Sequence, residues 1–249
     1  MTPSFDFLQR SVPLVAVASI GETVNVAAVH QPNPLRERFS SARTLALVTL
    51  GLLLAGCGDH VEGKARAQVE DAKAVPQRAA SDDAASAKTL RFSPDGSSIA
   101  FVGAKITGKH DGSFERFTGT IDLVDGDPTK SAVKVEIDMA SVQTDAEKLT
   151  QHLMHSDFFE IETHPKSAFE STQIRPEGGN RYVVTGNLDL HGVKKSITFP
   201  AAIDVAGEDV TVKAEFAINR KDFGIVYAGA PDDLIKDDVL LVLNVRAKP

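Results

Sequence analysis

The chain of 249 residues carries 34 acidic and 27 basic side chains, which give a formal net charge of −7. Apolar residues make up 42% and charged residues 24% of the chain, as in an ordinary folded globular domain. The negative charge removes the electrostatic attraction on which non-specific nucleic-acid binding depends, so we expect no nucleic-acid partner. A single cysteine, Cys57, excludes an internal disulfide framework and a thiolate metal cluster.

Residues 1–56 contain the parts of a secretory signal. Arginines at positions 36, 38 and 43 precede an apolar run at 44–56 that ends in small residues. This run is shorter than the roughly 20 residues that span a bilayer as a helix. Signals of this kind start near the N-terminus, so residues 1–35 indicate that translation truly begins further along the chain.

Cys57 directly follows this run. Residues 54–57 (LAGC) resemble the bacterial lipobox, in which the cysteine is acylated and becomes the new N-terminus. The resemblance implies a lipoprotein anchored in the bacterial cell envelope and facing the periplasm. Gly58 replaces the aspartate that resembles an inner-membrane retention signal in enteric bacteria, which favours the outer membrane. In the alternative interpretation, 45–54 forms a buried core helix and Cys57 is inert, but this run lacks a polar face.

Residues 57–88 are rich in alanine and in charges of both signs, and they contain no aromatic residue. Such a segment buries too little apolar surface to offset the entropy of ordering. We therefore interpret 57–88 as a disordered tether that joins the anchor to a folded domain at 89–249.

Within 89–249, apolar and polar residues alternate with period two between glycine, asparagine and aspartate turns. One helix is predicted at 145–154, where Leu149 and Leu153 lie on one face. Short turns favour antiparallel neighbours, and closure removes exposed sheet edges. We therefore predict an all-β fold, an eight-stranded antiparallel up-and-down barrel with one short helix, and keep an open β-sandwich as the alternative. The predicted strands are 99–104, 117–123, 133–139, 167–174, 182–190, 196–205, 210–218 and 239–247.

Four motifs in the strand region resemble the YceI-like, polyisoprenoid-binding family. They are 101–114 (FVGAKITGKHDGSF), 152–159 (HLMHSDFF), 184–195 (VTGNLDLHGVKK) and 219–224 (NRKDFG), and they occur in the family's order. The resemblance extends over roughly 98–248. The resemblance implies an exported lipocalin-like barrel, in some members of which the lumen holds a long isoprenoid chain.

The inward faces of the predicted strands supply an apolar lumen. Small residues on these faces, which are Gly103, Gly119, Ala201 and Ala214, are expected to leave room for a ligand. Phe158 and Phe159 follow the helix and either line the mouth of the lumen or plug the end of the barrel. The predicted lumen residues are Phe101, Phe117, Ile121, Phe158, Phe159, Phe199, Ala214, Phe216 and Ile218.

Two polar residues, Arg220 and His110, are candidates for the mouth of the barrel. Arg220 offers a fork of donors to an anionic head group, or else pairs with Asp222 or Asp157 as a structural clasp. His110 lies in a turn sequence before glycine.

Histidine spacing gives little support for a metal site, and none is predicted. His152 and His155 are three residues apart on the predicted helix, but no His-Glu-x-x-His motif is present. The other candidates are His110, His164 and His191. The sequence also lacks a Gly-x-Ser-x-Gly elbow and a glycine-rich phosphate loop, so we expect a protein that is not an enzyme.

These features predict a lipid-anchored envelope protein that binds an isoprenoid or another elongated lipid in the barrel lumen, without a cofactor. It would serve envelope transport, storage or stress protection. The alternative is a structural or interaction domain whose lumen is filled by its own side chains, because the chain has 13 phenylalanines.

Overall fold

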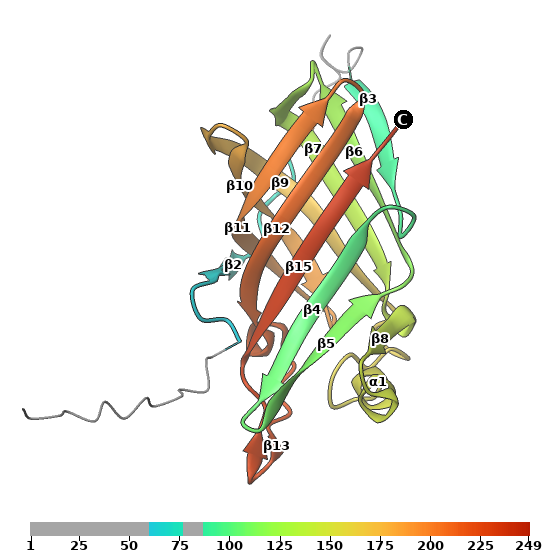
Figure 1. The fold of residues 1–249 in the computed structure, drawn as a ribbon, viewed down its shortest axis with the longest axis vertical. Coiled ribbons are helices and arrows are strands. Elements are labelled where there is room, and N and C mark those ends of the chain that lie inside the picture. The colour runs from blue at the N-terminus through green and yellow to red at the C-terminus, as the bar shows by residue number, and fades with distance from the viewer. Residues whose placement is uncertain (1–59, 77–86) are drawn as a thin grey trace, which may run out of the picture. The chain divides into compact units, whose positions relative to one another are not determined.

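A computed structural model describes residues 60–76 and 87–249, which belong to one compact unit dominated by a large curled antiparallel sheet (Figure 1). Within these ranges, the helical elements are η2 (Met139–Ser141), α1 (Glu147–Met154) and η3 (Arg220–Phe223). The strands are β1 (Ala65–Arg66), β2 (Gln68–Asp71), β3 (Ala87–Phe92), β4 (Ser98–Lys105), β5 (Gly108–Phe114), β6 (Phe117–Val124), β7 (Asp127–Asp138), β8 (Val142–Thr144), β9 (Lys166–Gly178), β10 (Arg181–Leu190), β11 (Val193–Ala206), β12 (Asp209–Asn219), β13 (Gly229–Ala230), β14 (Asp233–Leu234) and β15 (Asp238–Ala247).

The all-β prediction is confirmed, but the predicted number of eight strands is wrong. The strand order along the main path is β3-β6-β7-β9-β10-β11-β12-β15-β4-β5-β8, which is eleven strands. The eight predicted ranges correspond to β4, β6, β7, β9, β10, β11, β12 and β15, so the strands of this path that the prediction lacked are β3, β5 and β8. β3 pairs with β6, β5 pairs with β4, and β8 pairs with β5.

The curl of the sheet brings β3 back to the end of β15. Arg91 and Lys248 exchange two backbone hydrogen bonds with N···O distances of 2.6 and 2.9 Å. These bonds satisfy backbone groups that an open sheet would leave at its edge. The single curled sheet also contradicts the alternative of an open β-sandwich.

The predicted period of two is visible in the burial of β6. Phe117, Gly119, Ile121 and Leu123 are buried, while the residues between them are more exposed. The turn from β6 to β7 has only two residues, Asp125 and Gly126, with φ of 54° and 71°. Two positive φ values in a two-residue turn match the right-handed twist of paired strands, which explains the tight hairpin.

The prediction of a disordered tether at 57–88 is wrong for the part that the structure describes. β11 and β12 pair directly only between 202–206 and 209–213. Beyond that stretch, β2 pairs with β11 at 195–198, and β1 pairs with β12 at 216–217. The segment 60–76 thus supplies hydrogen-bond partners to two strands that diverge, and this gain offsets its poor apolar content.

Two side-chain contacts fix the same segment to the sheet. Val61 is 3% exposed and packs with Ala217 and Leu240. The side-chain amide of Asn187 accepts a hydrogen bond from the backbone nitrogen of Lys73 at 2.9 Å and donates to its carbonyl oxygen at 2.7 Å. The strand domain also begins before residue 89, because β3 starts at 87.

The predicted helix at 145–154 is confirmed as α1, which begins two residues later at Glu147. It lies at one end of the curled sheet, beside the β4–β5 hairpin and β8 (Figure 1). None of the helices in the described ranges has the length and apolar character needed to cross a membrane. The predicted signal at 1–56 and Cys57 fall outside the described residues.

Candidate functional site

A cavity of about 650 Å³ lies inside the curled sheet and is lined mainly by apolar side chains. This volume is in the range of about 300–1,000 Å³ that is typical of small-ligand sites. Nine of the predicted site residues line it, from strands, the loop after α1 and η3. They are Phe101, Ile121, Phe158, Phe159, Phe199, Phe216 and Ile218, together with the two mouth residues His110 and Arg220.

Two predicted lumen residues, Phe117 and Ala214, do not line the cavity. Phe117 is 4% exposed, and its ring centroid lies 6.5 Å from that of Phe92, which covers it on the cavity side. Ala214 is 6% exposed and packs within the main core cluster. Alternation places both residues on the inner face but gives no information on what covers them.

Of the inner-face glycines that were expected to leave room for a ligand, one does so and one does not. At Gly103 a Cβ atom would meet no atom within 4 Å, so this glycine leaves space as predicted. At Gly119 a Cβ atom would overlap the ring of Phe92, so its space is already filled. Gly112 is covered in the same way by the ring of Phe101.

Deep in the cavity, aromatic rings form a wall. The rings of Phe199 and Phe216 stack with centroids 4.1 Å apart and an interplanar angle of 12°. Phe169 packs against Phe199 with a centroid distance of 5.9 Å. Such ring pairs stabilise the fold by about 0.5–1.5 kcal/mol beyond their buried area.

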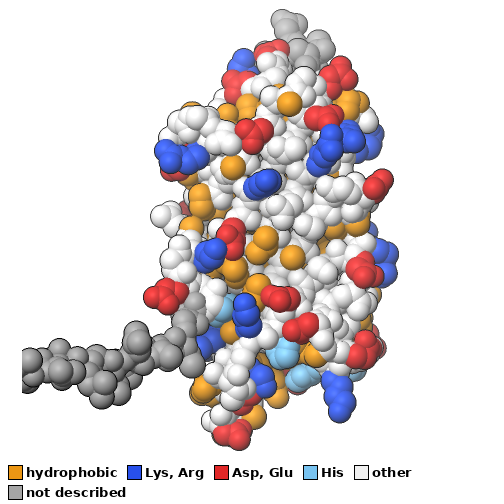
Figure 2. All heavy atoms as spheres, viewed as in Figure 1, with side chains coloured by type: hydrophobic (Ala, Val, Ile, Leu, Met, Phe, Trp, Pro, Cys, Tyr) orange, Lys and Arg blue, Asp and Glu red, His pale blue; other side chains and the backbone are white. Residues whose placement is uncertain are grey.

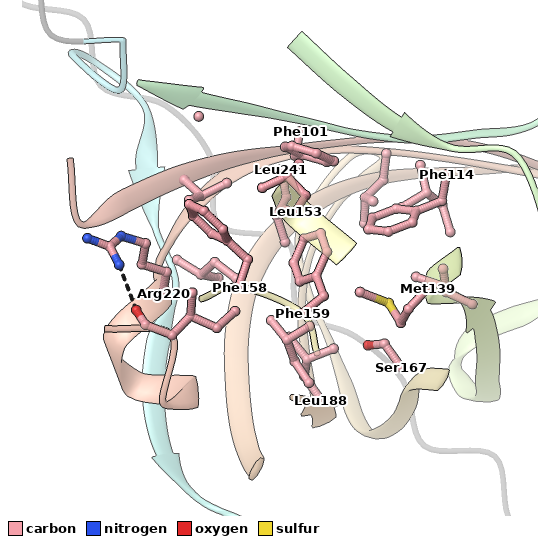
Figure 3. A pocket seen from close by; sticks show the side chains of 18 of the residues that line it. Phe101, Phe114, Met139, Leu153, Phe158, Phe159, Ser167, Leu188, Arg220 and Leu241 are labelled. Atoms are coloured by element: carbon pink, nitrogen blue, oxygen red, sulfur yellow. Dashed lines mark hydrogen bonds between the residues drawn. The ribbon is translucent and has the colours of Figure 1, made fainter. Parts of the chain in front are cut away.

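At the α1 end, Phe159 joins Phe101 and Phe114 in a cluster of three rings. The centroid distances from Phe159 are 6.5 Å to Phe101 and 6.0 Å to Phe114, and Phe101 and Phe114 are 5.7 Å apart. Figure 3 shows the Phe158 and Phe159 side chains pointing into the space between β4, β5 and Leu188. They reach it from residues 155–165, the connection between α1 and β9, which we name the aromatic loop.

A second cluster at this end contains His152, Phe158 and Tyr227. The centroid distances are 5.0 Å for His152–Phe158, 5.3 Å for His152–Tyr227 and 5.5 Å for Phe158–Tyr227. The Nε2 atom of His152 also lies 2.8 Å from the carboxylate of Asp157. Both aromatic-loop phenylalanines therefore form part of the cavity wall.

Arg220 is 4% exposed, and its guanidinium serves a structural purpose (Figure 3). Nη1 donates to the carbonyl oxygen of Ile225 at 2.7 Å, and Nε donates to that of Lys236 at 3.1 Å. Burial lowers the pKa of Arg220, and the nearby carboxylate of Asp237, at 3.4 Å, opposes this effect. The expected partners Asp222 and Asp157 are not among its contacts. Arg220 therefore forms a structural clasp, but with residues 225–237 instead.

That segment, residues 225–237, forms one side of the cavity end and includes β13 and β14. Asp233 fixes it to the β4–β5 hairpin, because its carboxylate accepts from the ammonium of Lys105 and from Thr107. These contacts lower the pKa of Asp233, the hydrogen bond from Lys105 having the largest effect. We name 225–237 the end segment.

The polar side chains at this end pair with one another. Nδ1 of His110 lies 2.8 Å from the carboxylate of Asp145. Figure 2 shows histidines and charges of both signs on the surface near the lower end of the view. Of the histidines considered from the sequence, His152 and His155 do not form a pair of ligands, because His152 contacts Asp157 instead.

Sequence reasoning missed several lining residues, which are Phe92, Phe114, Phe169 and Tyr227. Phe169 lies on the predicted strand at 167–174, so closer attention to its alternation would have found it. Phe92 and Phe114 lie on β3 and β5, which the sequence pattern did not predict. Tyr227 lies in the end segment, where no periodic pattern marks the side that faces the cavity.

An all-β curled antiparallel sheet with one α-helix and an internal apolar cavity defines a lipocalin-like protein. A family model for the YceI-like domain matches residues 90–247, and the chain belongs to the YceI-like family. The UPF0312 protein of Serratia proteamaculans is 34% identical over 143 residues, which is 55% of this chain and 74% of that protein.

Solved structures share the fold. BcnA of Burkholderia cenocepacia aligns with a TM-score of 0.57 and 22% identity, over 62% of this chain and 98% of that one. The YCEI protein of Campylobacter jejuni aligns with a TM-score of 0.51 and 25% identity, over 55% of this chain and 84% of that one. A third structure is a polyisoprenoid-binding domain from Saccharophagus degradans, which is implicated in plant cell wall breakdown. It aligns with a TM-score of 0.53 and 17% identity, over 65% of this chain and 99% of that one.

Proposed function

We propose that this protein binds an elongated apolar ligand, an isoprenoid or a similar lipid, in the cavity of the curled sheet. The observation that carries the proposal is the cavity of about 650 Å³ with its aromatic and aliphatic lining. Each methylene group that leaves water for this lining contributes about 0.8 kcal/mol to binding. The likeness to a polyisoprenoid-binding domain supports the same class of ligand.

The polar end of the cavity supports a binding role rather than a catalytic one. Asp233 is held by Lys105 and Thr107, and Asp145 is held by His110. Carboxylates with such fixed partners are suited to holding the end segment and the mouth in place. In this proposal, the cavity-lining side chains Lys105, His110 and Asp233 orient the head of a ligand whose chain lies among the rings.

We further propose that acylation of Cys57 anchors the protein in the bacterial cell envelope, facing the periplasm. The support is the lipobox-like sequence at 54–57. Several acyl chains are needed for stable anchoring, because a single chain gives only marginal membrane affinity. Metabolic labelling with a palmitate analogue is expected to mark the wild type and not Cys57→Ser. Equal labelling of both would refute the anchor while leaving the cavity proposal intact.

Native mass spectrometry tests the ligand directly. The protein extracted from a bacterial envelope is expected to carry a co-purified lipid mass. A bare mass, together with no uptake of a fluorescent isoprenoid in titration, would favour the alternative of a ligand-free structural or interaction domain.

A pair of glycine variants tests the location of the ligand. Gly103 lines the cavity and Gly108 does not, yet a Cβ atom would meet no atom within 4 Å at either position. Gly103→Leu should displace at least two methylene groups of the ligand, each of about 0.8 kcal/mol, and weaken binding about tenfold or more. Gly108→Leu should leave the affinity unchanged. Equal effects of the two variants would show that the ligand binds elsewhere.

A further inference from the structure

Three potential metal ligands meet where the aromatic loop approaches the turn between β10 and β11. Oε2 of Glu160 lies 3.8 Å from Nε2 of His164 and 3.7 Å from Nε2 of His191. The two imidazole centroids are 4.9 Å apart. One ligand atom from each of the three residues lies within 4.8 Å of the others.

The environment of His191 prepares it for coordination. Its Nδ1 atom lies 3.2 Å from the carbonyl oxygen of Phe223, which can only accept, so Nδ1 is the donor. The Nε2 atom is buried and has no hydrogen-bond partner among the described residues. Metal-binding histidines typically donate their second N–H to a carbonyl or carboxylate, which fixes the tautomer with the free lone pair toward the ion.

The local backbone brings the three side chains together. Glu160 and His191 have φ of 47° and 54°, a left-handed conformation that is uncommon for residues with a side chain. At Gly192, a Cβ atom would lie 2.5 Å from Cε1 of His164, so only glycine admits this ring beside the turn. The backbone nitrogen of His164 donates to the carbonyl oxygen of Glu160 at 2.8 Å, which places the two residues one turn apart.

We propose that Glu160, His164 and His191 bind one divalent transition-metal ion, of which zinc is the best match. Two imidazoles and one carboxylate are a ligand set that zinc takes, with Zn–N distances of about 2.0–2.1 Å. Two ligand atoms at tetrahedral angles around such an ion lie about 3.3–3.4 Å apart. The two carboxylate–imidazole separations of 3.7 and 3.8 Å are close to this value, and the remaining pair lies within 4.8 Å, so side-chain rotations bring the set together and leave the fourth position open to water.

Metal binding at this cluster would link the aromatic loop to the β10–β11 turn. Glu160 directly follows Phe158 and Phe159, whose rings line the cavity. An ion held between Glu160 and His191 would fix the loop and thereby the positions of both rings. The metal site itself does not depend on the identity of the cavity ligand.

The test uses the full chain, purified in detergent, stripped of metal with a chelator and titrated calorimetrically with Zn²⁺. We expect one ion per chain. Glu160→Gln and His164→Gln should each weaken Zn²⁺ binding by at least about tenfold, since loss of outer-shell partners alone costs about 10–100-fold. His155→Gln is the matched control, because His155 lies on the same aromatic loop but is exposed and outside the cluster. It should retain the wild-type affinity.

Cobalt substitution gives a readout that needs no variant. Co²⁺ bound by the wild type should show the intense visible absorption of a four-coordinate ion, and far-ultraviolet circular dichroism confirms that each variant is folded. No Zn²⁺ binding by the wild type would overturn the proposal and leave an ion-paired cluster. Zn²⁺ binding that survives both cluster variants, or a Co²⁺ spectrum of the hydrated ion, would also overturn it.

Discussion

Replacing Arg220 by methionine should destabilise the protein through the end segment. The wild-type guanidinium donates to the carbonyl oxygens of Ile225 and Lys236 at 2.7 and 3.1 Å. Methionine fills a similar volume but donates nothing, so both acceptors lose their partner. A buried acceptor left without a donor, such as that of Ile225, costs about 1–3 kcal/mol, and the part-buried acceptor of Lys236 costs less, which gives about 2–4 kcal/mol for the pair.

One effect acts in the opposite direction. Burial lowers the pKa of Arg220, because the charged form is less favourable away from water. Keeping the guanidinium charged in this position therefore costs free energy. Methionine removes that cost, as replacement of buried ions by apolar groups often does. We therefore expect a net loss near the lower limit, about 2–3 kcal/mol, because the two carbonyls remain while the charge is gone.

Thermal unfolding measures the effect. For a domain of this size, each kcal/mol lowers Tm by about 2–4 °C, so Arg220→Met should lower it by about 4–12 °C. Lys221→Met is the control, because Lys221 pairs with the same Asp237 carboxylate but is 46% exposed on its side chain. Exposed pairs contribute about 0–1 kcal/mol, so Lys221→Met should have little effect. Equal Tm values for the two variants would refute the clasp.

Three more predictions concern other parts of the fold. Gly119→Ala should lower the free energy of unfolding by about 1–3 kcal/mol, because the new methyl group overlaps the buried Phe92 ring, and urea unfolding with an unchanged midpoint would contradict this. The hydrogen bond from Lys105 lowers the pKa of Asp233 below 3.8, so its stabilising contribution is complete above about pH 4 and is lost as the pH falls through the folded-state pKa. Carboxyl NMR titration checks the direction, and a midpoint at or above 3.8 would be inconsistent with it. Deletion of 60–76 should lower Tm, because it removes the buried side chain of Val61, whose burial contributes about 1.5–3 kcal/mol. An unchanged Tm would show that the segment does not stabilise the fold.

The strands that the sequence predicts are those with one buried face. In β6 and β11, large apolar residues recur at every second position, so the period of two identifies both the strand and its inner side. β5 was missed because its sequence, GKHDGSF, is polar and glycine-rich, and only Gly112 is buried. Its place in the sheet comes from pairing with β4, which is a long-range property of the backbone.

The segment 60–76 shows the same limit more strongly. β1 and β2 are almost entirely exposed and contain charged residues, so composition alone favours disorder. Their order depends on unpaired backbone groups where β11 and β12 diverge, far away in the sequence. The Glu160 cluster was missed for a related reason, because its third member, His191, approaches only through the fold.

A sheet whose inner face is rich in phenylalanine can still hold an open cavity, and the glycines on neighbouring strands explain how. A ring that lies flat over a glycine occupies the place of the missing side chain and stays against the wall instead of crossing the lumen. Among the described residues, three cavity-lining phenylalanines are placed in this way, in the pairs Phe92–Gly119, Phe101–Gly112 and Phe169–Gly186. The number of phenylalanines alone therefore does not decide between a filled and an open lumen. Rings that face large side chains fill the lumen, whereas rings that cover a glycine leave the lumen open. In this chain the geometry favours the open state, which is the physical basis for a ligand-binding cavity.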